Sequence, residues 1–166
     1  MYKRQISDGR WRGYFGPAPQ RSEPGGEPDP GGPPDHWIRS ATSSDLLEWS
    51  VEPDVLVGSG AAHLTASARD VLPLLRDDGW VTLFYQLIKP QDSGIHDFSG
   101  VAVIGYSTSA DGIRFRKQFV LINERDPAGP DVLRLSDGTH LMYHDSTDYN
   151  GYGHGIRVGV LEFSSP

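Results

Sequence analysis

Two aspartates that open the same tripeptide are the residues of this sequence best suited to chemistry. Asp70 and Asp131 each begin an Asp-Val-Leu sequence, at 70–72 and 131–133. Carboxyl groups that work in pairs can donate a proton, accept a proton or attack an electrophilic carbon. The repeated placement therefore favours a shared site, and the alternative is that both are polar residues at the starts of exposed strands.

The histidines give a weaker signal than the aspartates. His140 and His144 are spaced to lie on one face of a strand, so a shared metal ion would need a further ligand from elsewhere in the chain. We therefore expect no metal site from them, and we expect His144 to contact a hydroxyl group or an ion. The sequence has no Gly-x-Ser-x-Gly, Walker or His-Glu-x-x-His motif, so serine hydrolases, nucleotide-binding proteins and zinc proteases have no support.

Composition narrows the classes of partner. The 166 residues include 15 Lys and Arg against 22 Asp and Glu, which gives a net charge of −7 and argues against binding to a phosphate backbone. No apolar run approaches the length of a membrane-spanning helix, so no membrane association is expected. The absence of Cys leaves both an extracellular and a cytoplasmic location open. The length fits one domain, and its oligomeric state is left open.

The sequence around these candidate residues predicts β-strands. Short runs of Val, Ile, Leu and aromatic residues alternate with turn signals such as Asp-Gly, which is typical of strands. The segment 16–35 is rich in Gly and Pro and is predicted to be a loop. Only 61–69 is a candidate for a helical turn. Strands are predicted at 10–15, 36–42, 70–76, 80–88, 100–108, 114–122, 131–136, 139–145 and 155–162.

Three repeated phrases organise these strands. An Asp-Gly turn followed by an aromatic strand occurs at 7–15, 77–85 and 136–143, and the segment 38–49 matches 104–115 with a constant offset of 66. Together with the two Asp-Val-Leu sequences, they define a unit of four antiparallel strands. Such units stack as the blades of a β-propeller, because each sheet buries both faces against its neighbours. We predict an all-β fold of about three four-stranded blades in an incomplete ring.

The blade phrases resemble those of the five-bladed propeller glycosidases. The segments GPDVLRLSDGTHLMYH at 129–144 and SATSSDLLEWSVEPDVLVGSG at 40–60 carry the resemblance, which covers nearly all of 6–162. The group includes arabinanases, xylosidases, levansucrases and invertases, and glycoside hydrolase family 43 is the most similar. The resemblance implies a glycoside hydrolase that acts on an oligosaccharide or polysaccharide. It implies no required cofactor, although a structural or funnel cation such as calcium is compatible with it.

The resemblance also assigns roles around a central funnel. It implies that Asp70 and Asp131, at the starts of inner strands, are catalytic carboxylates. Cleavage of a glycosidic bond needs one acid to protonate the leaving oxygen and one carboxylate to attack or to activate water. Asp126, in ERDP at 124–127, resembles the Arg-Asp-Pro phrase that holds sugar hydroxyls and competes with Asp131 for that role. His144 and Trp37 are further candidates for sugar contact.

The third acid of the group, a glutamate, has no clear match. Glu124 lies in a connection between blades, and Glu52 belongs to a fourth-strand turn. The missing glutamate keeps two alternatives open. One is a non-catalytic sugar-binding or scaffold propeller, and the other is a segment with no function of its own, whose exposed sheet edges favour self-association.

The remaining expectations concern structure. Asp45 and Asp111 are predicted to cap their own turns, and Trp11, Trp49 and Trp80 are expected to pack between blades. Residues 1–5 match the translation of a transposon-end sequencing adapter, so they are excluded from the fold and the gene is expected to begin upstream. A natural exposed N-terminus is the alternative. The first blade is then expected to lack its first strand, and the third blade its last.

Overall fold

The structure is a computed structural model that describes residues 2–6, 9–16, 38–57, 67–88, 102–116, 119–122, 127–147 and 154–163. These residues form eleven strands in three antiparallel sheets, with no helix and no sheet closed into a barrel among them. The described part of the chain accordingly contains no helix that could cross a membrane. The prediction of an all-β fold is confirmed.

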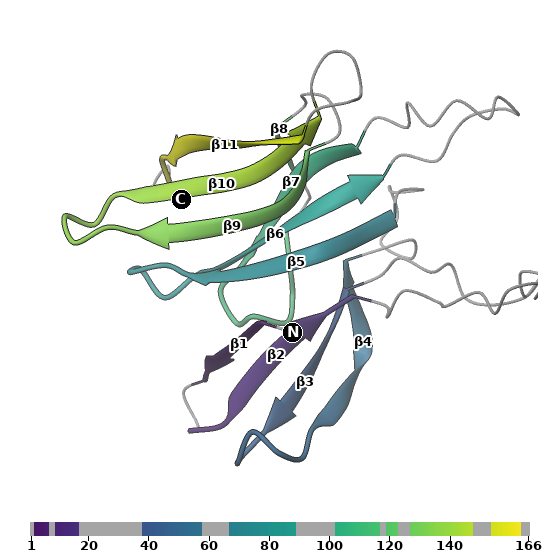
Figure 1. Ribbon diagram of the computed structural model, residues 1–166. Coiled ribbons are helices and arrows are strands. Elements are labelled where there is room, and N and C mark those ends of the chain that lie inside the picture. Colours follow the sequence, from purple (N-terminus) through teal and green to yellow (C-terminus); the bar gives the residue numbers. More distant parts are fainter. Residues whose placement is uncertain are drawn as a thin grey trace, which may run out of the picture.

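Each sheet is a simple up-and-down succession of strands (Figure 1). The first sheet has four strands, β1 (Tyr2–Gln5), β2 (Trp11–Phe15), β3 (Ile38–Ser43) and β4 (Ser50–Val57). The second also has four, β5 (Ser67–Leu75), β6 (Val81–Ile88), β7 (Ala102–Ser109) and β8 (Phe119–Ile122). The third has three, β9 (Ala128–Arg134), β10 (His140–Thr147) and β11 (His154–Leu161). β5 contacts both β1 and β9, so the first strands of the three sheets are neighbours, as in propeller blades.

Three parts of the fold differ from the sequence prediction: the strands β1 and β4 and the beginning of β5. Residues 2–5 form β1 and pair with β2, so the expectation that the first sheet lacks its first strand is wrong. The strand β4 was absent from the predicted strands because Glu52 and Pro53 interrupt its apolar pattern. Residues 67–69 begin β5 and pair with β6, so they form no helical turn; the rest of 61–69, like most of the loop 16–35, lies outside the described residues.

The glycines of the three Asp-Gly phrases lie in the same kind of tight turn. Gly9, Gly79 and Gly138 have φ of +81°, +83° and +89°, a region that favours glycine because it has no Cβ. In each turn the glycine amide donates to the carbonyl three residues earlier at 3.0 Å. The sequence repeat therefore corresponds to a structural repeat.

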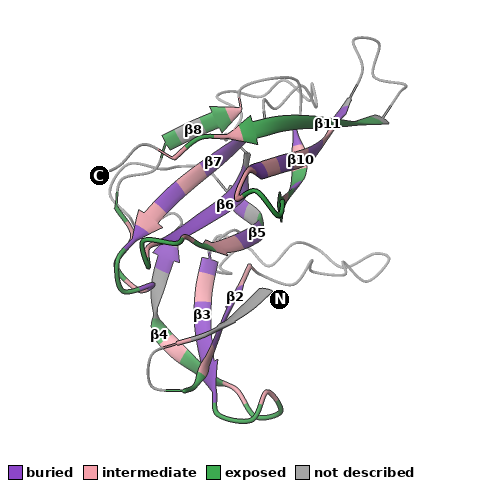
Figure 2. Cartoon of the chain, turned by 90° about the vertical axis from the view of Figure 1, so that its left-hand side faces the viewer, coloured by how far each residue is buried: buried purple, intermediate pink, exposed green. Residues whose placement is uncertain are grey.

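Two apolar layers hold the three sheets together (Figure 2). β6 is buried from Val81 to Gln86, since both of its faces are covered. The tryptophans Trp11, Trp49 and Trp80 are only half-buried and belong to neither layer, so the expectation that they form the core between blades is wrong. The aromatic residues that fill the layers are Tyr14, Phe84 and Tyr85. Between the first and second sheets the layer consists of Tyr14, Ile38, Leu56, Ala68, Val71, Val81, Leu83, Tyr85 and Val103. Between the second and third it is built around Leu72, Phe84, Ile104 and Met142.

Candidate functional site

Each sheet has two different ends. The tight turns at 6–10, 76–80 and 135–139 and the Ser-rich turns at 44–49 and 110–116 lie at one end, which we call the turn end. At the other end, which we call the loop end, the strands lead into segments outside the described residues (Figure 1). Asp70 and Asp131 lie on the first strands of the second and third sheets, β5 and β9, each as the fourth residue of its strand.

Asp70 lies in a β-bulge. Arg69 pairs with Gln86 and Leu72 pairs with Phe84, so that two residues of β5 lie opposite one residue of β6. Asp70 has a φ of 53°, in the left-handed region, and its side chain is exposed. This conformation costs roughly 1 kcal/mol in a residue other than glycine, and such strain is concentrated at functional sites. The bulge therefore presents an accessible carboxylate from a strained position.

The third sheet contains the same bulge with a different residue in it. Ala128 pairs with Asp145 and Asp131 pairs with Tyr143, which leaves residues 129 and 130 in the bulge. Gly129 has a φ of 52°, almost the value at Asp70. Gly129, not Asp131, is therefore the structural counterpart of Asp70.

The two aspartates consequently do not occupy equivalent places in their sheets. Asp131 takes the pairing position of Leu72, because it lies two residues closer to its Asp-Gly turn than Asp70 does. Its side chain is exposed, and its Oδ1 accepts a hydrogen bond from the Val132 amide at 2.9 Å. Both carboxylates remain accessible on neighbouring strands, but the expected repetition of their placement is not found.

His144 is buried opposite the bulge that holds Gly129. Only 6% of its surface is exposed, and its Nδ1 lies 3.0 Å from the carbonyl oxygen of Asp145. It shares a face of β10 with Met142, which packs between the second and third sheets. The described structure thus gives His144 a packing environment rather than an open face. Trp37, Asp126 and Glu124 lie outside the described residues.

A polar contact that the sequence did not indicate lies beside the start of β9. The buried amide of Gln86 donates to the carbonyl of Pro127 at 2.8 Å and so ties the second sheet to the residue that precedes β9. Gln86 is the pairing counterpart of Asp145 in the third sheet. No local pattern in the sequence indicates a contact of this kind, because the two partners lie 41 residues apart.

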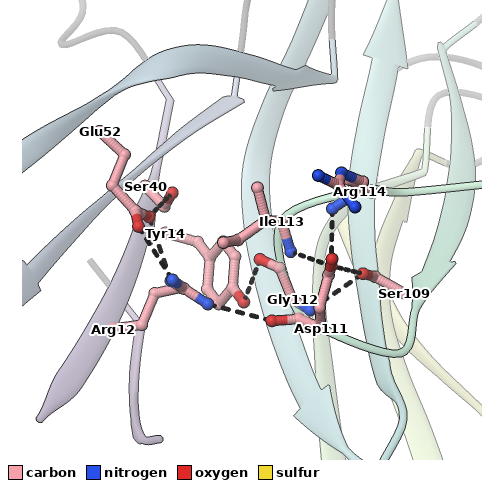
Figure 3. Close-up of polar contacts among 9 residues, drawn as sticks. All are labelled: Arg12, Tyr14, Ser40, Glu52, Ser109, Asp111, Gly112, Ile113 and Arg114. Carbon is pink, nitrogen blue, oxygen red and sulfur yellow. Dashed lines mark hydrogen bonds and ion pairs between the residues drawn. The ribbon is translucent and has the colours of Figure 1, made fainter.

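Glu52, one of the glutamates considered as a general acid, is held in a polar network at the turn end (Figure 3). Arg12 donates from Nε and Nη2 to its two carboxylate oxygens at 3.1 and 2.9 Å, and Ser40 donates to one of them. Burial would raise the pKa of Glu52, but the hydrogen bonds from Ser40 and Arg12 outweigh it and lower the pKa below its usual value. An acid catalyst needs a raised pKa, so Glu52 is better suited to a structural role.

The same network joins the first sheet to the second. Arg12 also donates from Nη1 to the carbonyl of Asp111 at 3.1 Å, and the Tyr14 hydroxyl donates to the carbonyl of Gly112 at 2.9 Å (Figure 3). The carboxylate of Asp111 faces its own turn, where it accepts from the amides of Ile113 and Arg114 at 2.8 Å. The prediction that Asp45 and Asp111 cap their turns is confirmed, since Asp45 accepts equivalent bonds.

Within the described ranges, no group of three His, Asp or Glu side chains could hold a metal ion. Asp70 and Asp131 are exposed carboxylates on the first strands of the second and third sheets. They can accept a proton, attack a carbon or bind hydroxyl groups.

Comparison with known proteins gives the fold. No protein-family model matches the sequence. A search of the curated proteins also finds no match. Among solved structures, the chain resembles a protein from Bifidobacterium bifidum s17 that is proposed to be an exo-beta-1,3-galactanase, with 15% identity and a TM-score of 0.57. The alignment covers 96% of this chain and 47% of that one, so the chain spans about half the length of the structure it matches. The chain thus shares the fold of part of a glycosidase-like protein.

Proposed function

We propose that this chain belongs to a carbohydrate-active protein of the glycoside hydrolase type, which binds sugar at the loop end of its inner strands. The observation that carries the proposal is Asp70, an exposed carboxylate in a strained bulge on an inner strand. Bulges often lie next to active sites, where they redirect a side chain. The fold shared with the Bifidobacterium protein supports the same class and makes β-linked galactosides the first substrates to test.

The proposed chemistry uses two carboxyl groups. Asp70 acts as the nucleophile or activates water, and Asp131 on the neighbouring strand β9 is the second carboxyl group at the site. Asp126 and Trp37 are proposed to contact the sugar, whereas the buried His144 is given no sugar contact. The acid that protonates the leaving oxygen is not among the residues assigned, since Glu52 is tied to Arg12.

A second candidate is a sugar-binding protein without catalysis. Gly129 favours it, because the bulge of the third sheet carries no carboxylate where the second sheet carries Asp70. A site with one bulge carboxylate can bind hydroxyl groups through hydrogen bonds even where it lacks the acid and base pair that hydrolysis needs.

The two candidates are separated by kinetics and calorimetry on the full chain. Hydrolysis of aryl β-galactosides and β-1,3-galactan is measured together with binding of β-1,3-galacto-oligosaccharides, for the wild type, Asp70→Asn and Asp131→Asn. Asp77→Asn is the control, because Asp77 is an exposed aspartate at the turn end. We expect Asp70→Asn to lower kcat/KM by about 100-fold or more, and Asp77→Asn to leave it unchanged.

Each outcome decides between the candidates. Binding without hydrolysis by the wild type, weakened in Asp70→Asn, would establish the sugar-binding alternative. Hydrolysis that survives in Asp70→Asn would remove Asp70 from the mechanism. The absence of both hydrolysis and binding across a panel of β- and α-linked oligosaccharides would contradict the proposal as a whole.

A further inference from the structure

A hollow lies at the turn end, between the second and third sheets. It has a volume of about 320 Å³, which is within the range of small-molecule pockets. Among the described residues no strand of the third sheet lies beyond β11, so β8 is left uncovered, and Phe119 and Leu121 are 47% and 38% exposed. The hollow therefore has an aromatic wall open to solvent.

The wall is built from rings in contact with one another. Tyr106 stacks on Phe119 with ring centroids 5.2 Å apart and planes 24° apart, and Phe84 lies 6.3 Å from Tyr106. Phe163 and Trp80 also line the hollow. Such a surface is suited to the flat apolar face of a ring.

Two guanidinium groups lie over aromatic rings of this hollow, but only one has a carboxylate partner. The Arg76 guanidinium lies 4.9 Å from the centroid of Phe163 and pairs with Asp78 at 2.6 Å. The Arg116 guanidinium lies 4.6 Å from the centroid of Trp80 and forms no ion pair with any described residue. Arg116 therefore offers several N–H donors in a fixed plane, the arrangement that binds a carboxylate through two hydrogen bonds.

An unsatisfied hydroxyl group in the same wall points independently to a ligand. Thr82 lines the hollow and is 1% exposed, and its Oγ1 has no hydrogen-bond partner among the described residues. A buried hydroxyl group without a partner destabilises a protein by roughly 1–3 kcal/mol. An acceptor atom of a bound molecule would supply the missing partner.

We propose that this hollow binds a small ring-bearing carboxylate. The ring packs against Tyr106 and Phe119, the carboxylate pairs with Arg116, and Thr82 donates a hydrogen bond to the ligand. Glu162 also lines the hollow and offsets part of its positive charge. A ligand with one carboxylate is therefore favoured over a ligand with two. This chemistry is shared by a sugar acid and an aromatic acid. The site lies at the opposite end of the sheets from Asp70, and the inference does not depend on the proposed function.

The test is titration of the full ¹⁵N-labelled chain with three probes. D-galacturonate and benzoate carry a carboxylate on a sugar ring and on an aromatic ring, and D-galactose is the neutral control. We expect saturable shifts of the backbone amides of Trp80, Thr82 and Arg116 with one or both carboxylates, at dissociation constants of about 1 mM, and none with galactose. A response to galacturonate alone identifies a sugar acid, and a response to benzoate alone identifies an aromatic acid.

Variants separate a specific site from a general effect. Arg116→Gln is expected to weaken binding at least about tenfold, because it removes the charge that pairs with the carboxylate. Arg134→Gln, which removes an exposed arginine outside this hollow, should bind as the wild type does. Thr82→Val should weaken binding without lowering the Tm, since its hydroxyl group has no internal partner. No saturable shift of these amides up to about 20 mM of either carboxylate, or unchanged binding in Arg116→Gln, would overturn the inference.

Discussion

Asp111 is the titratable residue with the clearest link to stability. A hydrogen bond from the Arg114 amide has the largest effect on the Asp111 carboxylate and lowers its pKa. Burial raises the pKa, but further hydrogen bonds from Ile113 and Ser109 lower it again. The net result is that the pKa of Asp111 falls to about 2. The folded-state pKa is thus below the ordinary value of 3.8. The resulting stabilisation is fully present above pH 3.8 and is lost as the pH falls through 2.

Because Asp111 stabilises the fold when its carboxylate is ionised, the effect of Asp111→Ala on stability should depend on pH. Because the side chain is exposed, solvent screening reduces the contribution, and we expect the free energy of unfolding to fall by about 1 kcal/mol at pH 7. At pH 2 the loss should be much smaller, since about half of the wild-type carboxyl groups are then protonated in the folded state. Urea denaturation of both proteins at the two pH values measures the difference. An equal loss at both would show that the charge of Asp111 is not the source.

Gly112 shows how closely the first and second sheets approach. Its φ is +74°, and a Cβ at this position would lie 2.7 Å from the Tyr14 hydroxyl oxygen. Gly138 is the matched control, because its φ is +89° but a Cβ added there would have no atom within 4 Å. We expect Gly112→Ala to lower the free energy of unfolding by about 2–4 kcal/mol and Gly138→Ala by about 1 kcal/mol. Equal Tm losses in thermal denaturation would contradict the close approach.

The left-handed conformation in the bulges of β5 and β9 predicts how substitutions in these two strands change stability. Asp70→Gly should hold or raise the free energy of unfolding by up to about 1 kcal/mol, because glycine adopts the left-handed conformation without steric cost. The same variant should lose the proposed activity. Gly129→Asp, with no atom within 4 Å of the added Cβ, should fold with a cost of about 1 kcal/mol. Denaturation curves and kinetics on both variants test this, and a loss of stability in Asp70→Gly would contradict the strain.

Some elements could be predicted from the sequence because their determinants are local. The Asp-Gly turns and the caps of Asp45 and Asp111 each depend on a few adjacent residues. The equivalence of Asp70 and Gly129 could not be predicted, because pairing with β6 and β10 sets the position of each bulge. The repeated Asp-Val-Leu sequence instead aligned Asp70 with Asp131.

In the molecule as a whole, Arg12 links Glu52 of its own sheet, 40 residues away, to the carbonyl of Asp111 beside the second sheet, 99 residues away. Such long-range contacts have no local signature, so the sequence predicted three sheets but not what joins them. Arg12→Met should lower the free energy of unfolding by about 2 kcal/mol, because it leaves the half-buried carboxylate of Glu52 without its cation. The double variant with Glu52→Gln should cost less than the sum of the single variants.

Urea denaturation of these variants measures the coupling energy between the side chains of Arg12 and Glu52. The control is Arg134→Met, which breaks an exposed pair with Asp77 and should change the free energy of unfolding by less than about 1 kcal/mol. Additive effects of Arg12→Met and Glu52→Gln would show that the two side chains do not act as a pair.

We propose that sugar binds at the loop end of the inner strands, beside Asp70. Amide chemical shifts of the full chain during titration with a β-1,3-linked galacto-oligosaccharide test this binding site. We expect saturable shifts at Asp70, Val71 and Tyr85, which are lost in Asp70→Asn. Shifts confined to the turn end, or unchanged in Asp70→Asn, would contradict it.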